Sequence, residues 1–545
     1  MIVYGDPSYQ ATLTSLSDRL RSHREGLPSG ASLDDLRSLL IEAGQLEQAV
    51  HDAGLDEALT PCERITDGLA NAFVSRWRGA EPVELPSFDE LPSGEERLTV
   101  KVPEGFAFYG LYPEGYAVAA RRWLDSVRPA GQVAVIGIRS IGTTLSAVVL
   151  ATLRGEGIPA HRFTVRPGGH PYARQVEIAP SLLHRAEWAL IVDEGPGQSG
   201  SSMASVAEAV HRAGIPRNRI AFLPGHGGEP GAQASEEVRS WWASVPRFVT
   251  PTEELRWKGR TLEETLAAAT GEVVTTREVS GGAWRELVFP DPASWPAIAL
   301  PFERRKILMT RTDGTKVIWK FTGLSEPLSS PGERGGGEGQ HLGFTSTPWI
   351  EGRPLRREDA TPEILTQIGR HIASVAGPRL ATDEADAARK RLEGVLYWNT
   401  LESPGPTIEL SAPIIDSLPS SGDGRLAPYE WRQTPEGTIV KVPRVASTLD
   451  HTIVGPQPIA WDVAGAMVEW GLNEATAAPL LAEVPAIDGE ALRFYRLAYA
   501  AFRMGTCAMF AGMSDEAEAA RLRRDEAFYR EAILRLTLAD LPPPS

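Results

Sequence analysis

An apolar run that ends in two adjacent acids is the segment of this chain best suited to chemistry. Trp188 to Val192 is followed by Asp193 and Glu194, and then by a loop of glycines and hydroxyl side chains from Gly195 to Met203. Such a run predicts a buried parallel strand, and open α/β sheets place their ligands beyond the carboxyl ends of these strands. Glycines allow close approach of the backbone, and N–H groups at the start of a following helix can hold a phosphate. The two acids suit hydroxyl groups or a metal ion, so the segment predicts a site for a phosphorylated sugar.

Two upstream segments place further polar side chains in expected loops. Val133 to Thr144 repeats the pattern of strand, loop and helix, with Arg139 and Ser140 in its loop and the helix continuing to Arg154. Thr164 to Arg174 is a basic segment rich in proline and glycine, and it contributes Arg166, His170 and Arg174.

In this order, the three segments resemble the diphosphate loop, the basic segment and the phosphoribosyl-diphosphate (PRPP) motif of type I phosphoribosyltransferases of the orotate type. The resemblance implies that Asp193 and Glu194 contact the ribose hydroxyls directly or through Mg²⁺, as catalytic and metal-binding residues. It implies that Arg166 and Arg174 neutralise the departing diphosphate. The other implied substrate-binding residues are Ile138, Arg139, Ser140, Ile141 and His170 at the diphosphate and Gly197, Gln198, Ser199, Gly200, Ser201 and Ser202 around the 5-phosphate.

Other interpretations of these residues remain open. A strand, two acids and a Gly/Ser turn also occur in ordinary Rossmann-like domains, where acids at strand ends cap helices. A single loop arginine such as Arg139 is usually solvated or in a surface ion pair, and His170 lies in a Pro/Gly loop that is expected to be exposed.

Composition restricts the partners. The chain has 545 residues and a net charge of −16, which argues against a nucleic-acid or anionic-membrane surface. Its apolar runs are shorter than the roughly 18 residues that span a bilayer, and the start lacks the features of a signal peptide. Cys62 and Cys507, the two cysteines, are far apart and form neither a disulfide framework nor a zinc site. We expect a cytoplasmic protein with small-molecule substrates, and a homo-oligomer remains open.

The pattern of elements predicts an α/β protein of three parts. Residues 1–95 read as a helical N-terminal region, residues 96–255 as the parallel-sheet phosphoribosyltransferase-like domain, and residues 256–545 as a second, α+β unit. Helical spacing of apolar residues after an N-cap at Ser32 supports the first part. In the second part, Phe106, Phe108 and Tyr112 are expected to be core strand residues, or alternatively to cover an acceptor base.

Two elements of residues 256–545 resemble aminoglycoside-phosphotransferase-like kinases. They are Trp349 to Leu355, which is similar to the hinge element, and Gly455 to Gly465, which is similar to a late segment containing a largely structural acid, here Asp462. The resemblance implies a kinase-like fold, with Lys320 on a strand of the smaller lobe in a nucleotide-binding position.

The acids that kinase chemistry needs are not found at the matching positions. Phosphoryl transfer in that family relies on a catalytic-loop Asp in an H-x-D-x-x-x-x-N pattern and on a second, metal-binding Asp that closes a strand. Asp423 lies near the expected loop without the His or Asn, and the strand from 438 to 443 has no acid at its end. Asp450 and His451 follow this strand, and they either substitute for the missing acid after an insertion or form an ordinary turn. We therefore expect a kinase-like domain that is non-catalytic or altered.

The sequence predicts a transferase that uses PRPP with Mg²⁺ and moves the phosphoribosyl group to or from a nucleobase-like acceptor. Two alternatives remain: a small-molecule kinase acting through residues 256–545, and a non-enzymatic sensor of PRPP or a nucleotide. A sensor would keep the loop from Asp193 to Ser202 but has no need of the basic segment, which is present here.

Overall fold

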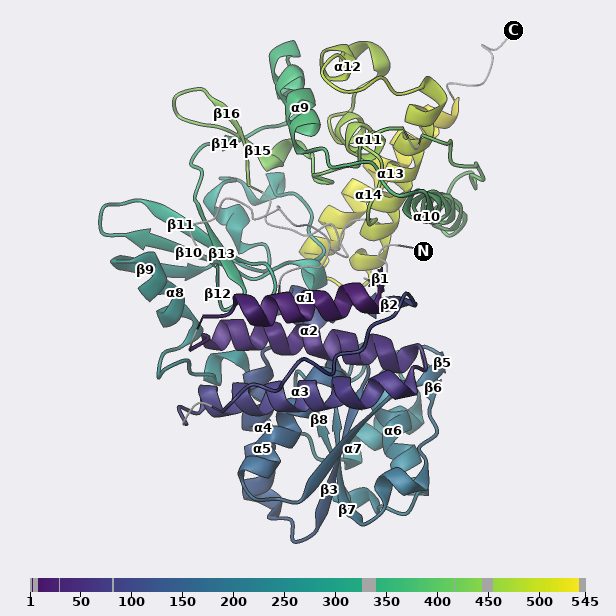
Figure 1. Ribbon diagram of the computed structural model, residues 1–545. Helices are drawn as coiled ribbons and strands as arrows, with labels where there is room; N and C mark the ends of the chain where they lie inside the picture. The colour runs from purple at the N-terminus through teal and green to yellow at the C-terminus, as the bar shows by residue number, and fades with distance from the viewer. Residues whose placement is uncertain are drawn as a thin grey trace.

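Three helices form the N-terminal part of the computed structural model, which describes residues 2, 8–28, 30–80, 83–325, 340–415, 417–443 and 454–538. They are α1 (Leu13–Gly26), α2 (Leu33–Asp52) and α3 (Asp56–Trp77), stacked across the middle of the molecule in Figure 1. Ser32 caps α2 as predicted, in a reciprocal capping box with Asp35. A short antiparallel pair, β1 (Ser8–Thr12) and β2 (Arg97–Lys101), brackets these helices.

The predicted parallel sheet follows, with strand order β4-β3-β7-β8. Its strands are β3 (Gln132–Ile138), β4 (Ala160–Val165), β7 (Ala186–Val192) and β8 (Ile220–Leu223). The flanking helices are α4 (Pro113–Val127), α5 (Ile141–Gly155), α6 (Ser201–Arg212) and α7 (Glu236–Ser244), and a small hairpin, β5 (Gly168–His170) with β6 (Ala173–Gln175), follows β4.

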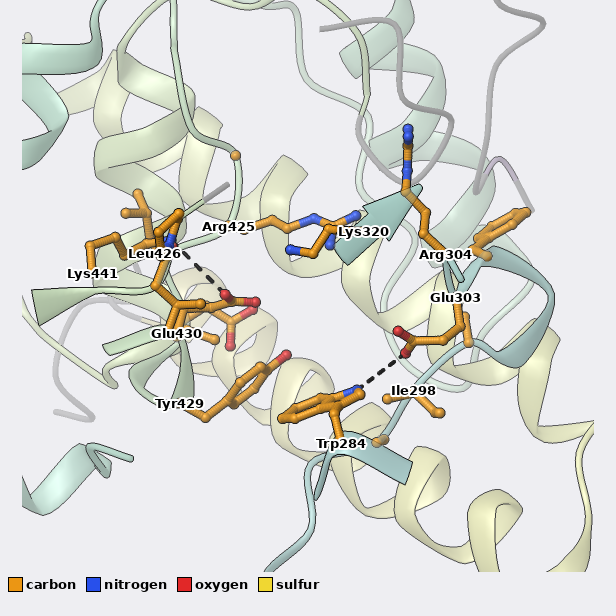
Figure 2. A pocket seen from close by; sticks show the side chains of 18 of the residues that line it. Trp284, Ile298, Glu303, Arg304, Lys320, Arg425, Leu426, Tyr429, Glu430 and Lys441 are labelled. Atoms are coloured by element: carbon orange, nitrogen blue, oxygen red, sulfur yellow. Dashed lines mark hydrogen bonds and ion pairs between the residues drawn. The ribbon is translucent and has the colours of Figure 1, made fainter. Parts of the chain in front are cut away.

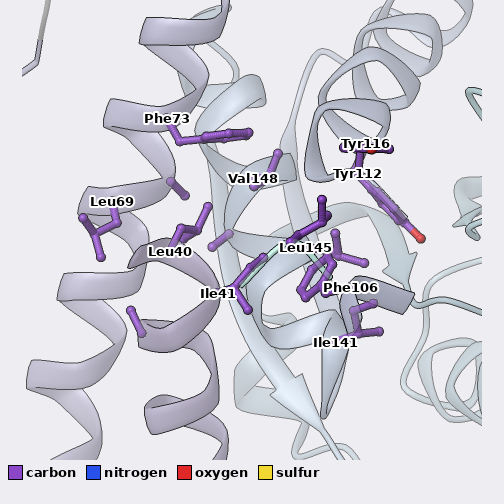
Figure 3. Packing of buried hydrophobic residues seen from close by; sticks show 14 of the residues in the cluster. Leu40, Ile41, Leu69, Phe73, Phe106, Tyr112, Tyr116, Ile141, Leu145 and Val148 are labelled. Carbon is purple, nitrogen blue, oxygen red and sulfur yellow. The ribbon is translucent and has the colours of Figure 1, made fainter. Parts of the chain in front are cut away.

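Both faces of this sheet are buried, which explains the continuous apolar runs of its strands. Alternate side chains such as Val135 and Leu190 join α2, α3, α4 and α5 in one cluster, whereas Ile136 and Ile191 join α6 and α7 in another. Figure 3 shows the first cluster, in which Ile41 of α2 and Phe73 of α3 face α5.

The second unit begins with an antiparallel sheet of order β12-β13-β11-β10-β9. Its strands are β9 (Val273–Glu278), β10 (Lys306–Arg311), β11 (Lys316–Phe321), β12 (Gln340–His341) and β13 (Phe344–Pro348), with α8 (Leu262–Thr270) before them. Ile307, Trp319 and Phe344 of this sheet belong to the same apolar cluster as α2 and β3. One continuous core therefore crosses both predicted domain limits, near residues 95 and 255.

The remaining chain forms a mainly helical lobe around a small sheet of order β14-β15-β16. The strands are β14 (Arg353–Pro354), β15 (Trp431–Gln433) and β16 (Ile439–Lys441). The helices are α9 (Pro362–Val375), α10 (Thr382–Leu401), α11 (Ala460–Glu469), α12 (Glu474–Leu481), α13 (Gly489–Ala511) and α14 (Glu516–Leu538). Among the helices that the structure describes, none is long and apolar enough to cross a membrane.

One local expectation was wrong. Phe106 and Phe108 are buried core residues, but they lie in a π-helical turn, Gly105–Tyr109, and not in a strand. Tyr112, also buried, precedes α4, and its hydroxyl donates to the carbonyl of Leu342 at 2.6 Å. The turn ends at Gly110, whose φ of 64° is favourable only for glycine-like residues. These aromatics therefore join the parallel-sheet domain to the antiparallel sheet.

Candidate functional site

The parallel sheet brings the three predicted segments to one edge. In the register of the sheet, Gly137 of β3 pairs with Val192 of β7, and Ile138 pairs with Val165 of β4. The loops that leave these strands must emerge side by side, because parallel strands share a carboxyl edge. The start of α5 also lies against the end of β7, since a Cβ at Gly142 would be 2.7 Å from the carbonyl oxygen of Val192.

Asp193 and Glu194 directly follow β7, an internal strand, as predicted. The carbonyl of Asp193 accepts a hydrogen bond from the Tyr116 hydroxyl at 2.8 Å, and Oε2 of Glu194 accepts one from the N–H of Gly105 at 3.1 Å. Burial raises the pKa of Asp193 to about 7. Burial, followed by the charges of Glu104 and Asp193, raises the pKa of Glu194 to about 8. The pair therefore titrates near neutrality and would ionise fully against a cation or hydroxyl donors.

The donor set fits a magnesium ion that is bound together with a substrate. Carboxylate oxygens are ligands of Mg²⁺, which typically takes one or two carboxylates and completes its shell with water and substrate phosphates. Within the described ranges, no group of three or more His, Cys, Asp and Glu side chains is arranged to hold a metal ion. Asp193 and Glu194 would thus hold Mg²⁺ only in company with oxygens of the ligand.

The loop after the acids leads into α6 through Gly200, which occupies the N-cap with a φ of 61°. A Cβ at Gly200 would lie 2.7 Å from both Pro230 and the indole nitrogen of Trp242, so only glycine fits. Glycine has no side chain to cap the helix, which leaves N–H groups of the first turn for other acceptors. The Ser201 hydroxyl donates to the carbonyl of Pro171 at 2.6 Å, and Ser199 Oγ accepts from the N–H of Ser201.

The other predicted phosphate-loop residues are placed as follows. Gly197, at a φ of 55°, and Gln198 are exposed on the loop, and Ser202 lies in the first turn of α6. The carbonyl of Gln198 accepts a hydrogen bond from the N–H of Gly231 at 2.9 Å, which ties the loop to the next connection. The loop is therefore held at both of its ends.

The predicted diphosphate side is partly assembled. Ile138 ends β3, Ser140 precedes α5, and Ile141 is its first, buried residue. Arg174 donates to the carbonyl of Pro167 at 3.4 Å within the β5–β6 hairpin, where His170 is exposed. Arg174 and His170 thus belong to the hairpin and not to the edge formed by β3 and β7.

Arg139 and Arg166 converge on an acid that the sequence analysis missed. Both guanidinium groups bind the carboxylate of Asp52, at the end of α2, with Nε–Oδ1 distances of 2.9 and 2.8 Å. Burial acts to raise the pKa of Asp52, but hydrogen bonding and charge from Arg166 and Arg139 hold it below its ordinary value. Asp52 therefore supplies an internal anion at the position where the resemblance expects a diphosphate.

A second candidate site lies between the antiparallel sheet and the helical lobe. It is a cavity of about 260 Å³ (Figure 2), with aromatic and aliphatic side chains among many charged ones. Its charged lining residues are Glu303, Arg304, Lys306, Lys320, Arg425, Glu430, Arg432, Lys441, Glu469, Arg503 and Asp525. The predicted nucleotide-binding residue, Lys320 on β11, is one of them.

The loop from 422 to 430 is anchored to α11 by hydrogen bonds. The carboxylate of Asp462 accepts the backbone N–H groups of Gly422, Asp423 and Gly424 at 3.0, 2.9 and 2.7 Å. Asp423 is buried, and its Oδ2 lies 2.6 Å from His371 Nε2 and 3.4 Å from Lys441 Nζ. Asp462 thus has the structural role that the sequence predicted, and the Asp423 carboxylate is engaged by the side chains of His371 and Lys441.

The residues of this loop can be compared with the spacing that the kinase resemblance implies. Asp423, Arg425 and Glu430 have the spacing of the His, Asp and Asn in H-x-D-x-x-x-x-N, and Lys441 closes the following strand, β16. At the positions where the kinase resemblance implies a catalytic acid and a strand-end acid, the chain has Arg425 and Lys441. From the sequence, Asp423 is expected near this loop and the strand from 438 to 443 lacks a terminal acid, but sequence reasoning did not single out Arg425, Glu430 or Lys441. Asp450 and His451 lie outside the described residues.

The comparisons with known proteins gave structural neighbours alone. No family model and no curated protein matches the chain. Among solved structures, choline kinase LicA from Streptococcus pneumoniae is similar with a TM-score of 0.27 and 11% identity, over 49% of this chain and 97% of that one. LicA in complex with AMP gives the same TM-score and identity over 50% of this chain and 97% of that one. Macrolide 2′-phosphotransferase MphH from Brachybacterium faecium is similar with a TM-score of 0.28 and 14% identity, over 52% of this chain and 98% of that one. At such scores the likeness carries no inference about activity.

Proposed function

We propose that this protein binds PRPP with Mg²⁺ at the carboxyl edge of the parallel sheet and transfers the phosphoribosyl group to, or from, a nucleobase-like acceptor. One observation carries the proposal. The adjacent strands β4, β3 and β7 bring three kinds of group to a single edge of the sheet: arginines, two carboxyl groups with pKa values near 7 and 8, and a helix N-terminus capped by glycine. A phosphorylated sugar diphosphate is complementary to these groups, since it offers anions at both ends and hydroxyls between them.

In this reaction the protein positions the substrates and forms no covalent bond with them. In the forward direction, the bond between the anomeric carbon and the diphosphate oxygen breaks, and the diphosphate leaves with the electron pair. A ring nitrogen of the acceptor forms the new bond to that carbon and loses its proton. Mg²⁺, when bound, supplies positive charge to the phosphate oxygens. The barrier falls because charge and orientation are arranged before the reaction begins.

Each protein group has a role that follows from its place at the edge. N–H groups of the first turn of α6 receive the 5-phosphate, and the carboxylates of Asp193 and Glu194 accept hydrogen bonds from the ribose hydroxyls. Arg139 and Arg166 take the diphosphate when it replaces Asp52 as their partner. Glu194 is already oriented by Gly105, so one carboxylate is positioned before the substrate arrives.

The proposal is tested with the full chain and Mg·PRPP. We expect PRPP to raise the Tm, because a ligand that binds the folded state stabilises it. The double variant Asp193→Asn, Glu194→Gln should lose that shift. Glu187→Gln is the matched control, since Glu187 is an exposed acid at the opposite end of the same strand. A shift that is as large in the double variant as in the control would refute the site.

Phosphorylation of a small molecule in the second cavity is the alternative function. Lys320 lies in that cavity, but Arg425 stands at the spacing of the catalytic-loop acid and Lys441 closes the strand that would carry the metal-binding acid. ATP-dependent phosphorylation of a sugar or nucleoside, lost in Lys320→Gln and kept in Asp193→Asn, would establish this alternative instead.

A further inference from the structure

Basic side chains from four separate segments converge in the second cavity. Lys306 comes from β10, Lys320 from β11, Arg425 from the loop that Asp462 holds, and Lys441 from the end of β16. Figure 2 shows Lys320 and Arg425 directed toward each other across the space between the sheet and the helical lobe. A cluster with this many contributing elements is a property of the tertiary fold.

Two of these cations have acidic partners among the described residues. Lys306 forms an ion pair with Glu303, and Lys441 lies 3.4 Å from Asp423 and 4.0 Å from Glu430. Asp423 is shared with His371. The side chain of Lys320 forms no hydrogen bond or ion pair with any residue that the structure describes. Within the part of the chain that the structure describes, the Lys320 ammonium is therefore balanced only by the longer-range charge of Glu430.

The electrostatics of the cavity favour an added anion. Burial lowers the pKa of Lys320 to about 8, with a smaller lowering contribution from Arg425 and Lys441 and an opposing one from Glu430. Burial, followed by the charges of Lys320 and Arg425, lowers the pKa of Lys306 well below its ordinary value. An anion at the centre would reverse this tendency, because opposite charge favours the protonated lysines.

The walls of the cavity add a flat apolar region next to the charges. The rings of Trp284 and Tyr429 lie 6.4 Å apart with their planes inclined by 33°, and both line the cavity with Ile298 beside them. Figure 2 places these two rings below Lys320 and Arg425. The volume of about 260 Å³ is near the lower end of the size of small-molecule sites, enough for one ring system with a phosphate group.

We propose that this cavity binds an aromatic organic phosphate without a divalent cation, with Lys320, Arg425 and Lys441 in contact with its phosphate. No bond is made or broken in the ligand. Lys320, Arg425 and Lys441 place basic side chains around the phosphate position, so a metal ion is repelled there and the protein supplies the positive charge itself. The inference is independent of the proposed transferase function, because it concerns a different cavity.

Binding has a structural consequence. Lys306 and Lys320 belong to the antiparallel sheet, whereas Arg425 and Lys441 belong to the lobe that β15, β16 and α11 build. A phosphate that contacts both sets joins the two sides of the cavity. We therefore expect the ligand to stabilise the folded chain and to act as a bound effector that is not consumed.

The test is binding of AMP, ADP and uncharged adenosine to the full chain, by calorimetry and thermal melting, in EDTA and in excess Mg²⁺. We expect AMP or ADP to bind and to raise the Tm in EDTA, adenosine to bind at least tenfold more weakly, and Mg²⁺ to weaken ADP binding. Binding that requires Mg²⁺, equal binding of adenosine, or no binding of AMP and ADP would each overturn the proposal.

Variants identify the cavity as the location. Lys320→Gln and, separately, Arg425→Gln should each weaken ADP binding in EDTA at least tenfold. Lys316→Gln is the matched control, since Lys316 lies on the same strand but is exposed and pairs with Glu351. The variant Asp193→Asn, Glu194→Gln should bind ADP as the wild type does. Loss of binding in that double variant, with Lys320→Gln unaffected, would place the ligand at the other site and refute the inference.

Discussion

Binding of Mg·PRPP should become tighter as the pH rises, and Asp193→Asn should reduce that dependence. Burial raises the pKa of Asp193 to about 7 and that of Glu194 to about 8, whereas both groups titrate near 4 in an unfolded chain. Folding therefore takes up protons between these values, and the stability of the ligand-free protein falls as the pH rises from about 4 to about 8. When a ligand that needs the ionised carboxylates binds, the two carboxyl groups must release those protons.

The size of the effect follows from the number of protons released. Each proton that binding displaces allows up to roughly a tenfold gain in affinity per pH unit below the pKa of its group. Glu194 accepts a hydrogen bond from Gly105 in the ligand-free protein, and full release of protons from both groups is not required. Between pH 6 and pH 8 we expect at least about a tenfold gain in the wild type, because Asp193 alone passes through its titration there.

Calorimetry in buffers of different ionisation enthalpy measures the proton release directly. At pH 7 the wild type should release more protons than Asp193→Asn on binding Mg·PRPP. Protons from PRPP itself contribute equally in both experiments, so they drop out of this difference. Glu187→Gln should behave as the wild type does. An affinity that is constant or falls with pH, or equal proton release in the wild type and Asp193→Asn, would refute the assigned role of the pair.

Three other predictions concern the groups around the two sites. Asp52→Asn should raise the affinity for PRPP several-fold and lower stability by about 1 kcal/mol, because Arg139 and Arg166 lose a competing anion; unchanged or weaker PRPP binding in titrations would contradict this. Gly200→Ala should lower stability by roughly 1–3 kcal/mol, through its positive φ and the 2.7 Å contact, and weaken PRPP binding. Gly197→Ala, with nothing within 4 Å, should cost less in the same melts, and equal costs would contradict the packing argument. Asp462→Ala should lower stability by about 3 kcal/mol or more in denaturant unfolding, since it leaves three N–H groups without their acceptor; a loss below about 1 kcal/mol would contradict it.

The elements of the parallel sheet could be predicted because burial on both faces leaves a strong local signal. The run before Asp193 became β7, the run before Arg139 became β3, and the helices expected after each loop are present as α6 and α5. The strand that contains Lys320 was predicted equally well as β11. Each of these signals lies within about ten neighbouring residues.

Contacts between distant residues left no such signal. Asp52 meets Arg166 across 114 positions, and nothing in the composition of α2 indicates a partner in the loop after β4. The π-helical turn at Phe106 is set by its packing between two sheets, which overrides the local preference for a strand. The cationic cavity combines β10, β11, β16 and a loop, so its charge became visible only when those segments were brought together.

Release of diphosphate from PRPP, measured for the full chain with Mg²⁺ and a panel of nucleobases, tests the central claim most directly. We expect release that depends on one class of base, is lost in the double variant Asp193→Asn, Glu194→Gln, and persists in Lys320→Gln. Absence of PRPP binding by the wild type, or release that the Asp193 and Glu194 substitutions leave unchanged, would contradict it.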